Sequence, residues 1–114
     1  MGAANNISAK AHIHETAVIA PGAKIAANVE VGPYAVIGEN VEIKNSRIGP
    51  YVSLGNGTSV VNSNIENSLI QEKTVINHGN LSNSMIGNNA HYYGVSREIS
   101  LGDYSVLDFH SKDQ

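Results

Sequence analysis

Aliphatic side chains recur every six positions through the first half of the chain, a spacing that neither an α-helix nor a simple alternating strand produces. Four residues after many of them stands a second small or branched residue, which lies two positions before the next aliphatic residue. A short strand would turn these two side chains toward the same face. Glycine or alanine often follows the aliphatic residue, where the chain has to turn. The regular positions are Ile7, Ile13, Ile19, Ile25, Val31, Ile37 and Ile43. The pattern predicts repeated units of one short strand and one turn.

Three such units close into a coil of about 18 residues, and stacked coils build a three-sided prism of about six coils with strands ~4.8 Å apart. The aliphatic residues then fall into three interior stacks. The first stack is Ile7, Ile25, Ile43, Val60, Ile76 and Tyr92; the second is Ile13, Val31, Ile48, Ile65 and Leu81, followed by Leu101; the third is Ile19, Ile37, Leu54, Ile70 and Ile86, followed by Leu107. The pattern therefore predicts an all-β repeat fold.

After residue 43 several steps shorten from six residues to five, and the shortened steps fall at two corners of the prism. Most of them carry the motif Asn-Ser-x-Ile, which begins at Asn45, Asn62, Asn67 and Asn83. Asparagine tolerates left-handed backbone, and aligned Asn and Ser side chains can hydrogen-bond along the stack. We expect one domain over residues 1–114, with regular hexads over 7–43, shortened coils over 44–92, and an insertion and cap over 93–114.

The two ends of such a prism expose strand edges and core side chains, so each end needs a cover. At the carboxyl end we expect Ile99, Leu101, Leu107 and Phe109 to fold across the last coil. The first six residues offer little apolar surface, and an upstream domain or a partner is expected to cover the amino-terminal end.

Charge and composition narrow the classes of partner. Charged residues make up 15% of the chain, where about 25% is typical, and the formal net charge is −3 without a cluster of Lys and Arg. Nucleic acids and anionic membranes are therefore not expected partners. There is no cysteine, and neither a signal peptide nor an apolar run of ~18 residues is present, so a cytoplasmic location is expected. His91 and His110 do not form a zinc-binding pattern, and no metal site is expected.

Several segments of the sequence resemble known protein families. The hexads of residues 7–55 resemble the left-handed parallel β-helix of hexapeptide-repeat transferases, with Ile13–Ile19 and Val31–Gly38 similar to the opening coils of sugar acyltransferases. The second half, from Asn45 onward, resembles the carboxyl-terminal domain of sugar-1-phosphate nucleotidyltransferases of the glucose-1-phosphate thymidylyltransferase-like group. The segments that carry this resemblance are the Asn-Ser-x-Ile motifs, Asn83–Ala90 and Ile99–Val106. The resemblance implies a single-stranded left-handed parallel β-helix of about six coils.

Two functions follow from these resemblances. In the first, the chain is an oligomerisation or regulatory module attached to an upstream nucleotidyltransferase domain; the Gly-rich nucleotide loop of that family is not in this sequence, and the chain itself needs no cofactor. In the second, the chain is an acyltransferase that uses acyl-CoA and a sugar acceptor. Both imply a homotrimer, and whether this chain is itself an enzyme stays open.

His78 is the candidate catalytic residue under the acyltransferase hypothesis, because it stands at a shortened corner where related acyltransferases carry the base that deprotonates the acceptor. A histidine that merely faces solvent at that corner is the alternative. His12 and His14 flank the inward Ile13, so both are expected to point outward as ordinary surface residues.

Five further residues are candidates for contacts with a ligand or a subunit. Tyr34 and Tyr51 belong to two Gly-Pro-Tyr motifs that stand 17 residues apart, so the two tyrosines are expected to lie one above the other at the same edge of the prism. Such a ledge suits a sugar ring, a neighbouring subunit or plain corner packing. Tyr92, Tyr93 and Arg97 are assigned to the insertion, either for a specific contact or for capping the end.

Overall fold

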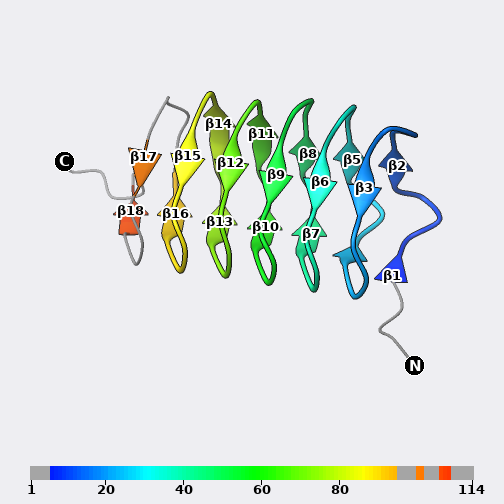
Figure 1. Cartoon of the computed structure of the whole chain (residues 1–114), viewed down its shortest axis with the longest axis horizontal. Helices are drawn as coiled ribbons and strands as arrows, with labels where there is room; N and C mark the ends of the chain where they lie inside the picture. The colour runs from blue at the N-terminus through cyan, green and yellow to red at the C-terminus, as the bar shows by residue number, and fades with distance from the viewer. Residues whose placement is uncertain (1–5, 95–99, 102–105, 109–114) are drawn as a thin grey trace.

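The computed structural model describes residues 6–94, 100–101 and 106–108, and within these residues every regular element is a short β-strand. The strands form three parallel sheets, which are the three sides of a prism (Figure 1). Sheet A holds β1 (Asn6–Ile7), β4 (Lys24–Ile25), β7 (Glu42–Lys44), β10 (Ser59–Val61), β13 (Val75–Asn77), β16 (His91–Tyr93) and β18 (Val106–Asp108). Sheet B holds β2 (His12–Ile13), β5 (Glu30–Val31), β8 (Arg47–Ile48), β11 (Asn64–Glu66) and β14 (Asn80–Ser82). Sheet C holds β3 (Val18–Ile19), β6 (Val36–Ile37), β9 (Ser53–Leu54), β12 (Leu69–Ile70), β15 (Met85–Ile86) and β17 (Ser100–Leu101).

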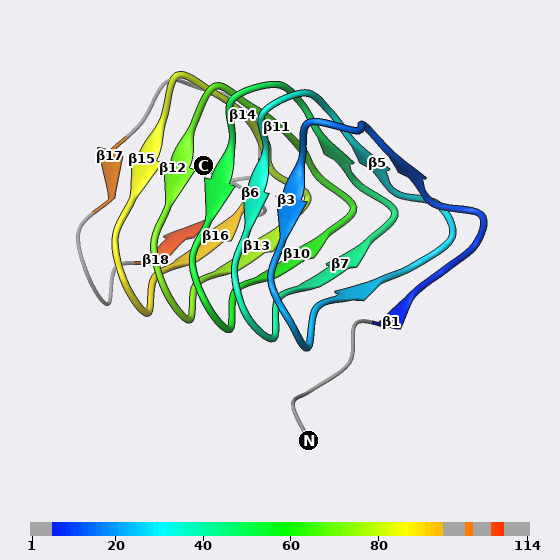
Figure 2. The ribbon, with the colours of Figure 1, turned by 45° about the vertical axis from the view of Figure 1, so that its right-hand side comes forward.

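The chain visits the three sheets in turn, so each coil lies directly on the coil before it (Figure 2). The register aligns the aliphatic residues as predicted: Ile25 pairs with Ile43 in sheet A, and Ile37 pairs with Leu54 in sheet C. These side chains point inward and form one continuous buried core. The predicted all-β parallel β-helix is confirmed, and the solenoid agrees with the left-handed winding that hexapeptide repeats imply.

Three predictions at the carboxyl end were wrong. Leu101 pairs with Ile86 in sheet C rather than extending the second stack, and Leu107 pairs with Tyr92 in sheet A rather than extending the third. Both residues therefore lie in strands that continue the ladder and not in a flap across its end. Tyr93 pairs with Asn77 inside β16, so the regular ladder runs through the residue at which the insertion was expected to begin. Ile99 and Phe109 lie outside the described residues.

The exchange follows from the order in which the described strands join the sheets after β16. In the described part of the chain, sheet B ends with β14, and after β16 the next described strand, β17, already belongs to sheet C. The intervening segment breaks the six-residue period, so counting by hexads assigned each later leucine to the wrong stack. The register after an insertion depends on where the chain re-enters the ladder, which the period does not encode.

The shortened corners turn through left-handed backbone, as predicted. Asn45, Asn62, Asn67 and Asn83 have φ values of 48°, 53°, 49° and 50°. The serine after each asparagine is buried and links two coils. The Ser63 hydroxyl donates to the Val61 carbonyl at 2.8 Å and accepts the Gly79 N–H at 2.9 Å. These ladders satisfy backbone groups that the tight corner would otherwise leave unpaired.

Residues 6–94, 100–101 and 106–108 contain no helix with the length and apolar character that a bilayer crossing requires.

Replacing Ser63 by alanine removes both hydrogen bonds and leaves the buried Gly79 N–H without its acceptor. We expect Ser63→Ala to lower the free energy of unfolding by roughly 1–3 kcal/mol. Urea denaturation followed by circular dichroism measures the change. The matched control is Ser59→Ala on the outer side of β10, which is expected to stay within about 0.5 kcal/mol; equal losses in the two variants would contradict the ladder's role.

Candidate functional site

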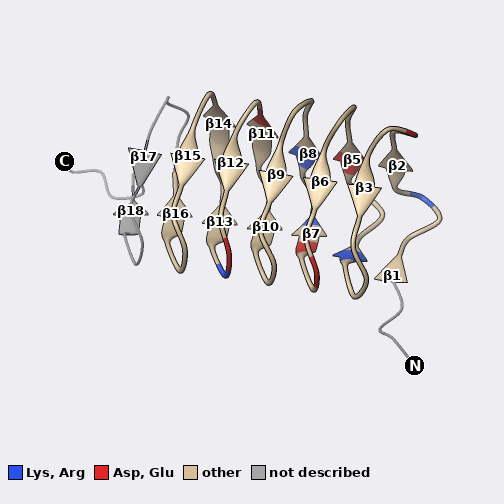
Figure 3. Ribbon diagram, in the orientation of Figure 1, with Lys and Arg blue, Asp and Glu red and all other residues tan. Residues whose placement is uncertain are grey.

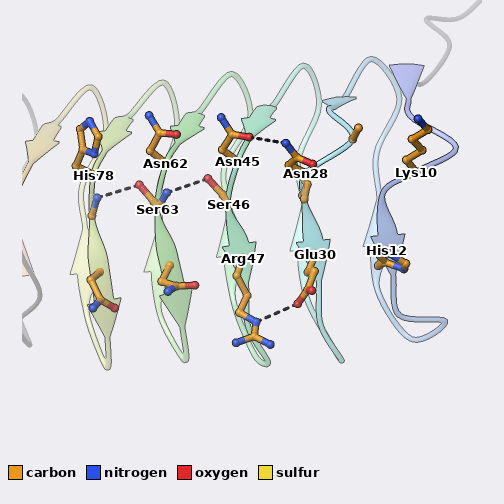
Figure 4. Close-up of a pocket in the computed structure, with 15 residues that line it drawn as sticks. Lys10, His12, Asn28, Glu30, Asn45, Ser46, Arg47, Asn62, Ser63 and His78 are labelled. Atoms are coloured by element: carbon orange, nitrogen blue, oxygen red, sulfur yellow. Dashed lines mark hydrogen bonds and ion pairs between the residues drawn. The ribbon is translucent and has the colours of Figure 1, made fainter.

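His78 stands at the corner between β13 and β14, above Asn45 and Asn62 of the two preceding coils. The step from Ile76 to Leu81 is one of the shortened ones, and His78 takes the left-handed conformation there, with φ of 57°. Histidine is among the residues that adopt this region more readily than most. The His78 N–H donates to the Val61 carbonyl at 3.1 Å, which fixes the backbone. The imidazole is exposed and projects outward from the corner (Figure 4).

Gly79 follows His78 because the core leaves no room for a side chain at this point. A Cβ on Gly79 would lie 2.7 Å from Ile76 Cγ2 and 3.1 Å from the ring of Tyr92. Tyr92 fills this space and is completely buried in the first stack. Its assignment as a ligand or interface residue was therefore wrong, while its place in the stack was predicted correctly.

A groove of about 860 Å³ runs along this corner and onto the outer face of sheet B. Side-chain amides supply much of its lining: Asn28, Asn45, Asn62, Asn64 and Asn80. Asn28 Nδ2 donates to Asn45 Oδ1 at 3.1 Å, one coil above (Figure 4). Each amide offers both donors and an acceptor, so the groove suits a ligand rich in hydroxyl and carbonyl groups.

The charged groups of the groove lie toward its amino-terminal end. Arg47 Nε lies 3.1 Å from Glu30 Oε1, in a pair exposed enough to add less than about 1 kcal/mol to stability. Lys10 and His12 lie beyond it (Figure 4). Glu30 is the single carboxylate among the described residues that line the groove, and it is already paired. The balance of charge therefore favours an anionic group on the ligand.

The sequence missed most of this groove. His78 was singled out, but Arg47, Glu30 and the amides of sheet B were not. A signal existed, because Glu30 and Arg47 stand 17 residues apart, one coil in this fold, and so meet on neighbouring strands. His12 and His14 are both exposed, as expected.

Tyr34 and Tyr51 stack at the corner between sheets B and C, as predicted. Their ring centroids are 5.4 Å apart at an interplanar angle of 14°, and the residues are 57% and 62% exposed. Both have φ of 59°, a conformation that costs an ordinary L-residue roughly 1–2 kcal/mol. Asn67 and Asn83 hold the same corner in the next two coils, and Asn67 Nδ2 donates to Asn83 Oδ1. The two tyrosines thus occupy positions that suit asparagine better, which points to a use for their rings.

The remaining candidates do not gather into a site. Tyr93 is half-buried on the outer side of β16, where its hydroxyl lies 3.4 Å from His91 Nδ1. Arg97 and His110 lie outside the described residues. Within the described residues, no three His, Asp or Glu side chains lie close enough together to hold a metal ion.

Comparisons with known proteins identify the repeat. A family model described as bacterial transferase hexapeptide (six repeats) matches residues 10–45. Over 40 residues the chain is 52% identical to the acyl-(acyl-carrier-protein)–UDP-N-acetylglucosamine O-acyltransferase of Rickettsia typhi. This alignment covers 30% of this chain and 15% of that protein. The enzyme of the same name from Rickettsia prowazekii matches to the same extent.

Solved structures agree on the fold. The chain superposes on a point mutant of perosamine N-acetyltransferase of Caulobacter crescentus, solved with CoA and GDP-perosamine, with a TM-score of 0.56 at 14% identity. The alignment covers 94% of this chain and 54% of that one. These comparisons establish the hexapeptide-repeat fold, and the sequence similarity that they find is to sugar acyltransferases. They do not support the resemblance of the second half to nucleotidyltransferases. The chain spans about 15% of the curated relatives it matches.

The left-handed backbone at His78 allows a test of which side chains this corner accepts without strain. Valine is branched at Cβ and is strained at positive φ, so His78→Val is expected to lower the free energy of unfolding by about 1–2 kcal/mol. His78→Asn places the residue found at Asn45 and Asn62 and is expected to change stability by less than about 0.5 kcal/mol. Thermal or urea unfolding compares the two, and equal stability of both variants would contradict the strain.

Proposed function

We propose that this chain is the β-helical part of an acyltransferase that moves an acyl group from acyl-CoA to an amine or hydroxyl of a sugar. The observation that carries the proposal is the placement of His78, which projects from a rigid corner beside a groove lined by amides and two cations. The curated relatives named above are sugar O-acyltransferases, and the solved structure with CoA is a sugar N-acetyltransferase, which supports this choice of reaction.

The chemistry asked of His78 is general-base catalysis. Its neutral imidazole takes the proton from the acceptor nitrogen or oxygen as that atom attacks the thioester carbonyl carbon. The new C–N or C–O bond forms, the C–S bond breaks, and the CoA sulfur leaves as a thiol after it regains a proton. A corner fixed by backbone hydrogen bonds suits this task, because a base must be held near its proton to be effective.

The rest of the groove would bind the two substrates. Arg47 and Lys10 provide cationic groups for phosphates, which both CoA and a sugar nucleotide carry. The amides near His78, including Asn64 and Asn80, provide donors and acceptors for the hydroxyl groups of an acceptor sugar. The chain itself needs no metal for this reaction.

The assembly and cellular location remain predictions. A single prism presents the groove on an open side, so a second subunit would be needed to enclose the substrates, in keeping with the homotrimer expected from the sequence. A cytoplasmic location fits a CoA-dependent reaction. The alternative, a regulatory module behind an upstream nucleotidyltransferase domain, rests on the resemblance of the second half of the sequence alone.

Turnover tests the proposal directly. The chain is incubated with acetyl-CoA and a panel of amino and hydroxyl sugar nucleotides, and released thiol is measured. We expect His78→Asn to lower kcat by roughly 10²–10⁴-fold with little change in CoA binding, because the variant keeps the corner but loses the base. His14→Asn, at an exposed histidine that does not line this groove, is the matched control and should retain most of the rate. Wild-type protein that neither binds CoA in calorimetry nor releases thiol would contradict the function.

A further inference from the structure

The stacked tyrosines at the corner between sheets B and C are not explained by the turn they occupy. Tyr34 and Tyr51 both hold left-handed backbone, and both keep more than half of their surface exposed. Asn67 and Asn83 make the same turn in the next two coils with a side chain that suits it better. A strained position that holds a large aromatic ring in solvent points to a role for the ring itself.

The two rings border a shallow hollow of about 470 Å³ on the sheet C side of the corner. Its apolar lining comes from Val36, Leu69 and Met85. Ser53 and Asn67 add a hydroxyl and an amide to the same hollow. Aromatic, aliphatic and hydrogen-bonding groups therefore meet in one place, which is the composition expected of a site for a small molecule.

The column of corner residues changes from a large ring to a short amide between Tyr51 and Asn67. The Asn67 N–H donates to the Pro50 carbonyl at 2.9 Å, so the two corners lie one coil apart, at ~4.8 Å. Tyr34 covers one face of the Tyr51 ring, since the two rings are stacked with centroids 5.4 Å apart. The opposite face is turned toward the coil of Asn67, whose shorter side chain leaves space beyond the ring. A flat ligand placed there would continue the stack of rings.

Hydrogen-bonding groups lie beside this space. Asn67 Nδ2 donates to Asn83 Oδ1, and an amide has a second N–H and a carbonyl oxygen that remain able to bind a ligand. Ser53 is half-buried on β9 and is the direct neighbour of Leu69 on β12. The edge of a ligand that stacks on Tyr51 would therefore meet an amide and a hydroxyl, both of which pair well with hydroxyl groups.

The charge around the hollow disfavours an anionic ligand. None of the described residues that line it is charged, and the strands of sheet C from β3 to β15 carry no charged side chain (Figure 3). Glu66, the residue before Asn67, places an exposed carboxylate at the end of β11. A phosphate in the hollow would meet this carboxylate without a cation among the lining residues to balance it. A neutral ligand is favoured over a nucleotide.

A pyranose ring meets each of these conditions. One face of a β-linked glucose or galactose unit is a flat patch of C–H groups, which packs on an aromatic ring. Its hydroxyl groups lie around the edge of the ring, where they would reach Asn67 and Ser53. An aliphatic chain or a plain aromatic ligand would instead desolvate those two polar groups without pairing them, which costs free energy.

We propose that Tyr34, Tyr51 and the hollow beside them bind a neutral pyranose unit, as a free glycoside or as one sugar of an oligosaccharide. His78 stands at the corner between sheets A and B, whereas the tyrosines stand at the corner between sheets B and C. The sugar site is therefore separate from the groove of the proposed acyl transfer, and it does not depend on that function.

Saturation-transfer NMR on the whole chain tests for binding, with methyl β-glucoside, methyl β-galactoside and cellobiose as probes. At least one of them is expected to receive saturation, strongest at the ring C–H protons of one face, with a Kd on the order of 1 mM because the hollow is shallow. AMP, which has a flat base but carries a phosphate, is expected not to displace the sugar. No saturation of any of the three sugars, or displacement by AMP, would overturn the proposal.

Substitution at Tyr51 tests the location. Tyr51→Asn places the residue that Asn67 and Asn83 hold at this corner, so it removes the ring and keeps the turn. It is expected to weaken sugar binding at least about tenfold while the Tm stays the same or rises, because strain is relieved. Tyr51→Phe keeps the ring and is expected to bind within about threefold of wild type.

Three outcomes of this series would overturn the proposal. In the first, binding survives Tyr51→Asn unchanged. In the second, His78→Asn rather than Tyr51→Asn abolishes binding, which would place the sugar in the groove on sheet B. In the third, Tyr51→Asn lowers the Tm by more than about 5 °C, which would show that the tyrosine rings serve to stabilise the corner. Acyl transfer is measured separately, so failure of that function leaves the test of the sugar site intact.

Discussion

The structure depends on one constraint, that each coil must lie one strand spacing above the previous coil with its aliphatic side chains in line. The core is only three stacks wide, so a coil has no other partner for its backbone than its two neighbours. The parallel ladder fixes the register, and the register fixes which side chains are inside. Because few contacts exist beyond adjacent coils, the stability of the solenoid is a sum of coil-to-coil terms.

The corners follow from the same constraint. A coil of sixteen to eighteen residues with three straight sides has to turn through very short bends, several of them in the left-handed region. Such a bend points its side chain away from the axis, where the core places no demand on it. Asn45 and Asn62 use that position for polar groups along the groove, His78 for a titratable group, and Tyr34 and Tyr51 for aromatic surface. The fold therefore leaves these corner positions free to carry side chains of different chemistry.

The three faces between the corners point in different directions, so the outward side chains of one sheet can differ in chemistry from those of another. Sheet B gathers amides and an ion pair, whereas sheet C gathers apolar side chains and no charge among the described residues. The polar groove and the apolar surface therefore lie on different sides of one small prism. This separation explains how a chain of 114 residues with a narrow core can offer both a polar groove and an apolar face.

The sequence alone determined the three stacks, the left-handed asparagine corners and the tyrosine stack, because each follows from a period read along the chain. It also pointed to His78 through its place at a shortened step. Only the tertiary structure decided the register of Leu101 and Leu107, since the break in period before them removes the count on which register rests. It also decided which outward residues share a face, as with Glu30 beside Arg47 or Val18 beside Val36. Those neighbours stand a whole coil apart in the sequence, so their contact exists only after every intervening corner has set the rise and turn of the helix.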